Sequence, residues 1–67
     1  MSKAKEKLLI DIDRFLAEFD MAASTFGRLA VNDGKFVKRL KSGARYWPET
    51  EEKVRAYMAR RRKEAGK

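Results

Sequence analysis

Cationic side chains are concentrated in one short stretch of this 67-residue chain. Residues 34–42 contain Lys35, Lys38, Arg39 and Lys41 and no acidic residue. Ammonium and guanidinium groups bind phosphate oxygens, and a guanidinium can also donate two parallel hydrogen bonds to O6 and N7 of guanine. The chemistry that this stretch favours is therefore the binding of a polyanion.

The charge of the whole chain shows the same bias. The net charge is +7. Residues 1–33 contain five basic and six acidic side chains, whereas residues 34–67 contain twelve basic and four acidic ones, so the two parts carry −1 and +8. Such an asymmetry indicates a polyanionic partner. The alternative is that the charge serves solubility, because many small proteins carry a net charge of several units.

Several other chemistries lack the residues that they need. The chain has no cysteine and no histidine, so it lacks thiolate and imidazole ligands and the usual general base near neutral pH. It also has no Gly-rich phosphate loop and no cluster of metal ligands. We therefore expect no enzymatic activity, no metal and no cofactor.

No apolar run approaches the roughly 18 residues of a membrane span. Four of the first seven residues are charged, and they lead into only a short apolar stretch, unlike an export signal. We expect no membrane partner and a cytoplasmic, nucleoid-associated protein.

Apolar side chains recur at three- and four-residue spacing, which predicts an all-α fold. We expect one domain, 1–67, formed by a compact bundle of four to five short helices that contains a helix-turn-helix. The predicted helices are 4–19, 22–31, 34–42 and 50–62, and the basic residues 60–67 are expected to fray. The first helix carries the longest apolar stripe, formed by Leu8, Leu9, Ile12, Phe15, Leu16 and Phe19.

The later helices have shorter apolar faces. We expect their core residues to be Phe26, Leu29 and Ala30, then Phe36, Val37 and Leu40, and finally Val54, Tyr57 and Met58. Gly27 costs about 1 kcal/mol relative to alanine inside a helix, so a packing reason is expected for it. Trp47 precedes a proline and is interpreted as a lid on the small core.

Turn and capping residues set the predicted boundaries. Asn32, Asp33 and Gly34 tolerate turn conformations, and Asn32 or Asp33 can cap the next helix. Gly43 is expected to end the helix that begins near residue 34. Thr50 is expected to be the N-cap of the last helix.

The segment from Thr25 to Gly43 resembles the helix-turn-helix of the phage lambda repressor and Cro-like family. The matching positions are Ala30, Val37, Leu40 and Gly43. The likeness covers about 20 residues closely and extends loosely over 8–58, and it also includes small helix-turn-helix proteins of alphaproteobacteria. Ala23 and Lys35 stand where family members often have glutamine or serine, so the family's specific base contacts are not carried over.

In this motif the start of the second helix reads bases in the major groove, and flanking residues bind phosphates. The base-facing candidates are Gly34, Lys35, Lys38 and Arg39. The candidates for backbone contacts are Arg28, Lys41, Ser42, Arg45 and Tyr46. The auxiliary basic residues are Arg60, Arg61, Arg62 and Lys63. The alternative for each cation is an ordinary solvated side chain.

Three functions remain open from the sequence. The first is a sequence-specific DNA-binding protein that regulates transcription and reads the major groove of double-stranded DNA with residues 34–42. The second is a nonspecific nucleoid-associated or RNA-binding protein that uses the same basic surface. The third is a protein–protein adaptor that offers Val54, Tyr57 and Met58, or the Trp47 loop, to a partner. A homodimer would read two half-sites about one helical turn apart, although no surplus apolar stripe marks a dimer surface.

Overall fold

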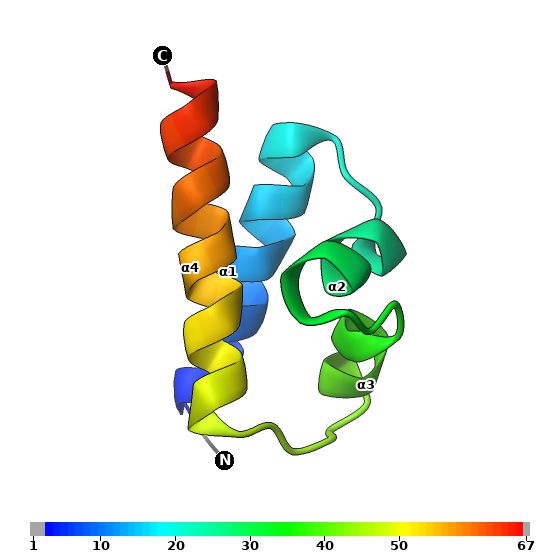
Figure 1. Cartoon of the computed structure of the whole chain (residues 1–67). Coiled ribbons are helices and arrows are strands. Elements are labelled where there is room, and N and C mark those ends of the chain that lie inside the picture. The colour runs from blue at the N-terminus through cyan, green and yellow to red at the C-terminus, as the bar shows by residue number, and fades with distance from the viewer. Residues whose placement is uncertain (1–2, 67) are drawn as a thin grey trace.

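The computed structural model describes residues 3–66 and places four helices in that range (Figure 1). They are α1 (Lys3–Phe19), α2 (Ala23–Val31), α3 (Phe36–Lys41) and α4 (Pro48–Ala65). The described residues contain no strand, so the predicted all-α bundle is confirmed. α2 packs against both α3 and α4, and α1 contacts α3.

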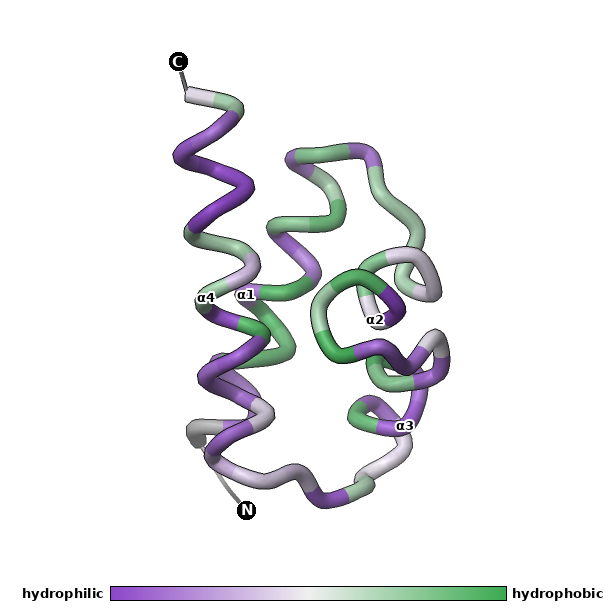
Figure 2. Tube along the Cα trace, viewed as in Figure 1, coloured by the Kyte–Doolittle hydropathy of each residue, from purple (hydrophilic) through white to green (hydrophobic). Residues whose placement is uncertain are grey.

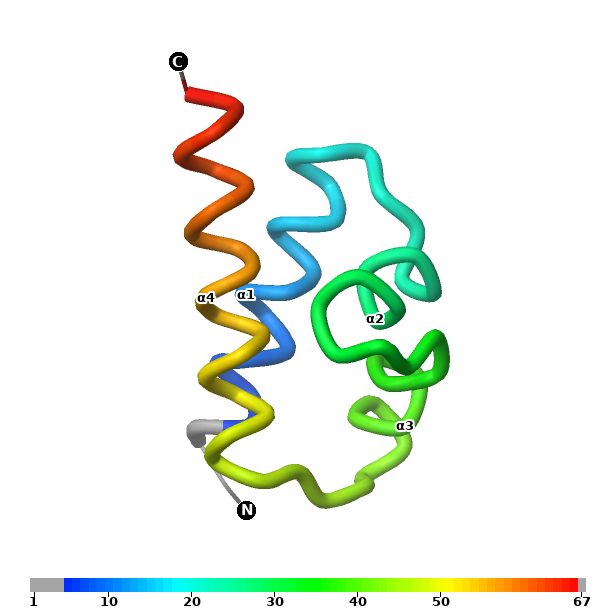
Figure 3. The backbone as a smooth tube through the Cα atoms, in the orientation of Figure 1, coloured from blue at the N-terminus to red at the C-terminus, as the bar shows by residue number. Residues whose placement is uncertain are grey.

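The two long helices, α1 and α4, run in the same direction (Figures 1 and 3). Arg55 Nη1 donates to Asp11 Oδ2 at 2.8 Å, and Arg62 Nε donates to Glu18 Oε1 at 3.1 Å. The partners in both pairs are separated by the same 44 residues along the chain. The pairs lie seven residues, or about two helical turns, apart on each helix. They therefore fix the register of α4 on α1.

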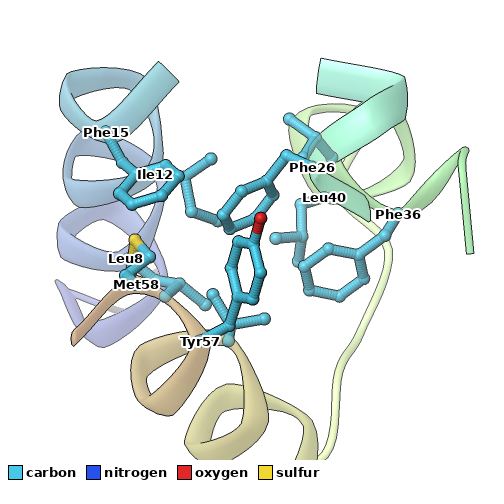
Figure 4. Packing of buried hydrophobic residues seen from close by; sticks show 10 residues of the cluster. Leu8, Ile12, Phe15, Phe26, Phe36, Leu40, Tyr57 and Met58 are labelled. Carbon is cyan, nitrogen blue, oxygen red and sulfur yellow. The ribbon is translucent and has the colours of Figure 1, made fainter. Parts of the chain in front are cut away.

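All four helices contribute to one apolar core (Figure 4). The ring of Tyr57 lies 5.9 Å from that of Phe15 and 5.6 Å from that of Phe26, centroid to centroid. The buried hydrophobic residues are Leu8, Ile12, Phe15, Phe26, Phe36, Val37, Leu40, Val54, Tyr57 and Met58. Most of the predicted core is thus confirmed, with Leu9, Leu16, Phe19 and Ala30 packed around its edge.

Leu29 is the predicted core residue that the structure places outside, with 57% of its surface exposed. Each residue turns an α-helix by about 100°, so Leu29 and Ala30 lie on opposite sides of Phe26. The buried face of α2 also includes Gly27 and is therefore centred on the Ala30 side. The side chain of Leu29 is turned out of the core because Gly27 faces in.

The connection between α2 and α3 is a sharp turn (Figure 3). Asn32 ends α2 in the left-handed conformation, with φ 58°. Asp33 Oδ1 accepts a hydrogen bond from the N–H of Lys35 at 3.0 Å, and the Asp33 carbonyl accepts one from Phe36 at 3.1 Å. Lys35 has φ −101° and ψ 7° and is not helical, so α3 begins at Phe36 and not at residue 34 as predicted.

Gly27 has the expected packing reason. A Cβ atom at this position would overlap the carbonyl oxygen of Asp33. The N–H of Asp33 also donates to the carbonyl of Gly27 at 3.0 Å. The turn backbone therefore lies directly on the surface of α2, in space that only glycine leaves free.

Gly43 ends α3 as predicted. Its φ is +100°, a conformation that residues with a side chain rarely adopt. The N–H of Gly43 donates to Leu40 at 3.1 Å, and the N–H of Ala44 donates to Arg39 at 2.9 Å. These two bonds form a Schellman motif, which satisfies carbonyl groups that the end of a helix leaves unpaired.

The predicted start of α4 is wrong by two residues. Trp47, not Thr50, occupies the N-cap position, and Pro48 is the first helical residue. Proline suits that position because its fixed φ is helical and its missing N–H would have had no partner there. The N–H groups of Thr50 and Glu51 instead donate to the Trp47 carbonyl.

α4 also continues beyond residue 62, where it was predicted to end, as far as Ala65. The guanidinium groups of Arg61 and Arg62 lie over the rings of Phe19 and Phe15, 5.8 and 5.5 Å from the centroids. Contacts with α1 thus support the part of the basic run that was expected to fray. Of that run, Lys67 lies outside the described residues.

Replacing Gly27 by alanine is expected to destabilise the fold by about 2–3 kcal/mol, because the new methyl group must displace the turn at Asp33. Urea unfolding followed by circular dichroism would measure this cost. Gly34→Ala is the matched control, since a Cβ there would meet Ser24 O at an ordinary 3.6 Å. Equal stability of the two variants would contradict the overlap.

The Asp11–Arg55 pair predicts a pH dependence of stability. The hydrogen bond from Arg55 holds the pKa of Asp11 below its ordinary value of 3.8, against the opposing effect of burial. A lowered carboxyl pKa stabilises the fold above the unfolded-state pKa, and this contribution is lost as the pH falls through the folded-state value. Asp11→Asn should therefore cost about 1 kcal/mol near pH 7 and progressively less below about pH 4.

Urea titrations of wild type and Asp11→Asn at several pH values from 7 down to about 2 provide the test, because the difference is expected to shrink only below about pH 4. Glu6→Gln serves as a control, because Glu6 is exposed on the same helix. A difference in unfolding free energy between wild type and Asp11→Asn that stays constant with pH would show that the pKa of Asp11 is not lowered.

Candidate nucleic-acid interface

α3 has a buried face and an outward face. Phe36, Val37 and Leu40 are buried in the core. The opposite side, here named the outward surface of α3, consists of the exposed residues Lys35, Lys38, Arg39 and Ser42. Figure 2 shows the resulting alternation of hydrophobic and hydrophilic segments along this short helix.

Two cations on this surface carry unneutralised charge. The ammonium groups of Lys35 and Lys38 have no ion-pair partner among the described residues, and both side chains are exposed. The Ser42 hydroxyl donates to the Lys38 carbonyl at 3.0 Å and so turns back onto the helix. The two lysines are free to bind an anion without first breaking a contact within the protein.

Arg39 differs because it is paired. Its Nη2 forms an ion pair with Asp33 Oδ2, while the other oxygen of Asp33 accepts from the N–H of Lys35. The sequence favoured a capping role for Asp33 over a base contact, but the N-cap position of α3 is Lys35, and no side chain caps the helix. The ion pair was missed because the two residues lie on different sides of a helix start, where no regular spacing reveals a contact.

Lys41 lies on the flank of α3 that faces α1. Its Nζ is 3.3 Å from Asp13 Oδ1, and about half of each side chain is exposed. Lys41 was expected beside the phosphate-binding residues, but the structure directs it to a carboxylate on α1. An exposed pair of this kind contributes little, about 0–1 kcal/mol, so a competing phosphate could replace Asp13.

The loop after α3 continues the basic surface. Arg45 is exposed and has no ion-pair partner among the described residues, and it shares a cleft of about 310 Å³ with Arg39. Lys5 Nζ donates to the carbonyl of Ala44 at 2.8 Å, which ties this loop to α1. Arg39 and Arg45 therefore flank one cleft between α3 and the start of α4.

Two aromatic side chains line the same cleft. Tyr46 is half-buried, and burial together with the carboxylate of Glu51 raises its pKa above the ordinary value, so its phenol is neutral at physiological pH. Trp47 is 75% exposed. The interpretation of Trp47 as a core lid is therefore wrong, because the N-cap position turns its side chain outward at the start of α4.

The remaining candidates lie apart from α3. Arg28 is exposed on α2 with no ion-pair partner among the described residues, and Gly34 is half-buried in the turn. The run at 60–63 lies on the C-terminal half of α4, which extends away from α3 (Figure 1). Arg61 and Arg62 contact α1, whereas Arg60 and Lys63 are exposed and have no ion-pair partner among the described residues. The structure thus separates the two basic groups that the sequence placed in one half of the chain.

The exposure of Trp47 predicts a small effect of its removal. Trp47→Ala should change the free energy of unfolding by less than about 0.5 kcal/mol, as expected for a surface substitution. Leu40→Ala, at a buried position on α3, should cost about 2–5 kcal/mol. Urea unfolding followed by circular dichroism compares the two variants. A large loss of unfolding free energy in Trp47→Ala would show that Trp47 covers the core after all.

Among residues 3–66, no group of three or more carboxylate, thiol or imidazole side chains is placed to hold a metal ion. None of the described helices combines the length and the apolar character that crossing a bilayer requires. Comparison of the chain with protein-family models, with curated proteins and with solved structures gave no significant match.

Proposed function

We propose that this chain is a sequence-specific DNA-binding protein that regulates transcription and reads the major groove with α3. The observation that carries the proposal is the outward surface of α3. It presents Lys35, just before the first turn, and Lys38 and Arg39, on the helix itself, while the opposite face of this short helix is anchored in the core. The major groove of B-DNA is about 12 Å wide and admits one α-helix.

The three cations have distinct tasks in this proposal. Arg39 supplies the planar guanidinium that suits O6 and N7 of guanine, a contact worth about 1–3 kcal/mol of discrimination. Lys35 and Lys38 supply point charges for base acceptors or for phosphates at the edge of the groove.

Gly34 contributes room. Its φ does not require glycine, and a Cβ atom at this position would make only an ordinary contact with Ser24 O. The fold therefore does not account for a glycine here. In the proposed complex, the missing side chain lets the DNA approach the turn next to Lys35.

Phosphate contacts on both sides of α3 would orient the helix in the groove. Arg45 and Tyr46 follow α3, Ser42 lies at its end, and Arg28 is exposed on α2. Lys41 would join them by exchanging Asp13 for a phosphate. Arg60 and Lys63, at the far end of α4, would add only long-range attraction, which salt screens over about 10 Å.

The adaptor alternative loses one of its two surfaces in the structure, whereas the other, the loop at Trp47, is exposed. Val54, Tyr57 and Met58 are in the core and cannot be offered to a partner without unfolding. The nonspecific alternative uses the same cations as the proposed function. Only a measurement of sequence discrimination separates the two.

Selection of bound DNA from a random duplex library at about 150 mM salt is the deciding experiment. We expect one enriched motif, and a two-fold symmetric motif would indicate a homodimer on two half-sites. Binding without enrichment would support the nonspecific function instead. No binding to DNA or RNA would contradict both.

A charge-matched pair of double variants tests the surface itself. Lys35→Ala/Lys38→Ala should weaken binding at least about tenfold. It should also lower the slope of log affinity against log salt by about 1.8, because two cations that neutralise phosphates are lost. Arg14→Ala/Lys53→Ala removes the same charge from exposed sites on α1 and α4. Equal losses in the two variants would indicate general electrostatics rather than binding through α3.

A further inference from the structure

An acidic side chain borders the outward surface of α3. Asp33 is the only acidic residue between positions 21 and 48 of the chain. Its side chain is about one-third exposed. A carboxylate repels phosphate groups, so a carboxylate beside the proposed DNA-binding surface lowers the affinity for DNA. Its presence there calls for a second role that offsets this cost.

Both oxygens of the Asp33 carboxylate are engaged. Oδ1 accepts the N–H of Lys35 at 3.0 Å, and Oδ2 pairs with Nη2 of Arg39. The backbone of Asp33 is itself fixed, because its N–H donates to Gly27 and its carbonyl lies against the surface of α2. The carboxylate therefore extends from a turn whose backbone is held against α2.

The ion pair with Asp33 restrains the side chain of Arg39. An arginine side chain has many rotamers and loses conformational entropy when it is held in one geometry. With Nη2 bound to Asp33, the planar guanidinium is oriented before any ligand arrives, and its other N–H groups remain available because 59% of the side chain is exposed. Pre-orientation of this kind reduces the entropic cost of binding.

We propose that Asp33 is a positioning residue that fixes the guanidinium of Arg39 for one base contact and thereby sets sequence discrimination. This inference rests on the proposed function, in which α3 enters the major groove. Asp33 acts in two ways. It strengthens the contact of Arg39 with the preferred base, and its charge weakens attachment to DNA that lacks this base.

Asp33→Asn removes the carboxylate charge without disturbing the turn. The amide oxygen of asparagine can still accept the N–H of Lys35, and asparagine is as well suited to the turn. The charge that pairs with Arg39 is lost. Unfolding by urea should therefore be nearly unchanged, whereas the ratio of affinities for the selected duplex and an unrelated duplex should fall about tenfold.

Repeating the selection with variants provides a readout that a purely structural role would not change. Asp33→Asn should relax one position of the motif, and Arg39→Ala should relax the same position. In the Arg39→Ala background, Asp33→Asn should have no further effect on base preference, because the residue that it positions is gone. Lys53→Ala, on exposed α4 surface, is the control and should leave every position unchanged.

The outcomes are distinguishable. A wild-type motif that Asp33→Asn leaves unchanged, or relaxes equally at all positions, would overturn the inference but not the proposed function. An additive effect of the two substitutions would also overturn it. A wild-type protein that enriches no motif would overturn the proposed function and this inference with it.

Discussion

The close approach of two backbone segments at Gly27 and Asp33 governs the arrangement of the molecule. Because no side chain separates them, the turn lies on α2, and α3 leaves at an angle that directs Phe36 into the core. The same contact places the carboxylate of Asp33 beside Arg39. One missing methyl group therefore determines both how α3 is anchored and how its outward surface is arranged.

The elements that sequence could predict are those that local spacing determines. The apolar stripes of α1 and α4 identify buried residues such as Ile12 and Val54, because a helix brings every third or fourth residue to one side. Gly43 is likewise a local signal, since the left-handed conformation at a helix end favours glycine. The all-α fold follows from these features without knowledge of long-range contacts.

The errors concern residues whose environment depends on another element. Leu29 and Ala30 both have apolar neighbours at helical spacing, and only the position of α3 against Gly27 decides which of them is buried. Trp47 and Thr50 were misplaced together, because a proline at the first helical position moves the start of α4 and turns the indole outward. Tertiary context outweighed local preference at these sites.

The same limit applies to charge. The positive charge counted in residues 34–67 includes Arg55 and Arg62, which the structure assigns to fixing α4 on α1. Lys41 is also paired, with Asp13, although that exposed pair is weak enough for a phosphate to replace the carboxylate. Sequence cannot distinguish such structural cations from those that remain for a ligand, because their partners are distant in the chain. The cations on the outward surface of α3 are therefore far fewer than the twelve basic residues counted in residues 34–67.

The separation of the buried and exposed faces of α3 also affects how the sequence of this protein can evolve. Its buried residues, Phe36, Val37 and Leu40, are separate from the exposed Lys35, Lys38 and Ser42. Exposed positions can be exchanged without altering core volume, and surface substitutions usually shift stability by no more than about 0.5 kcal/mol. Under the proposed function, a new binding preference can therefore arise by successive single replacements, none of which requires a compensating change in the core.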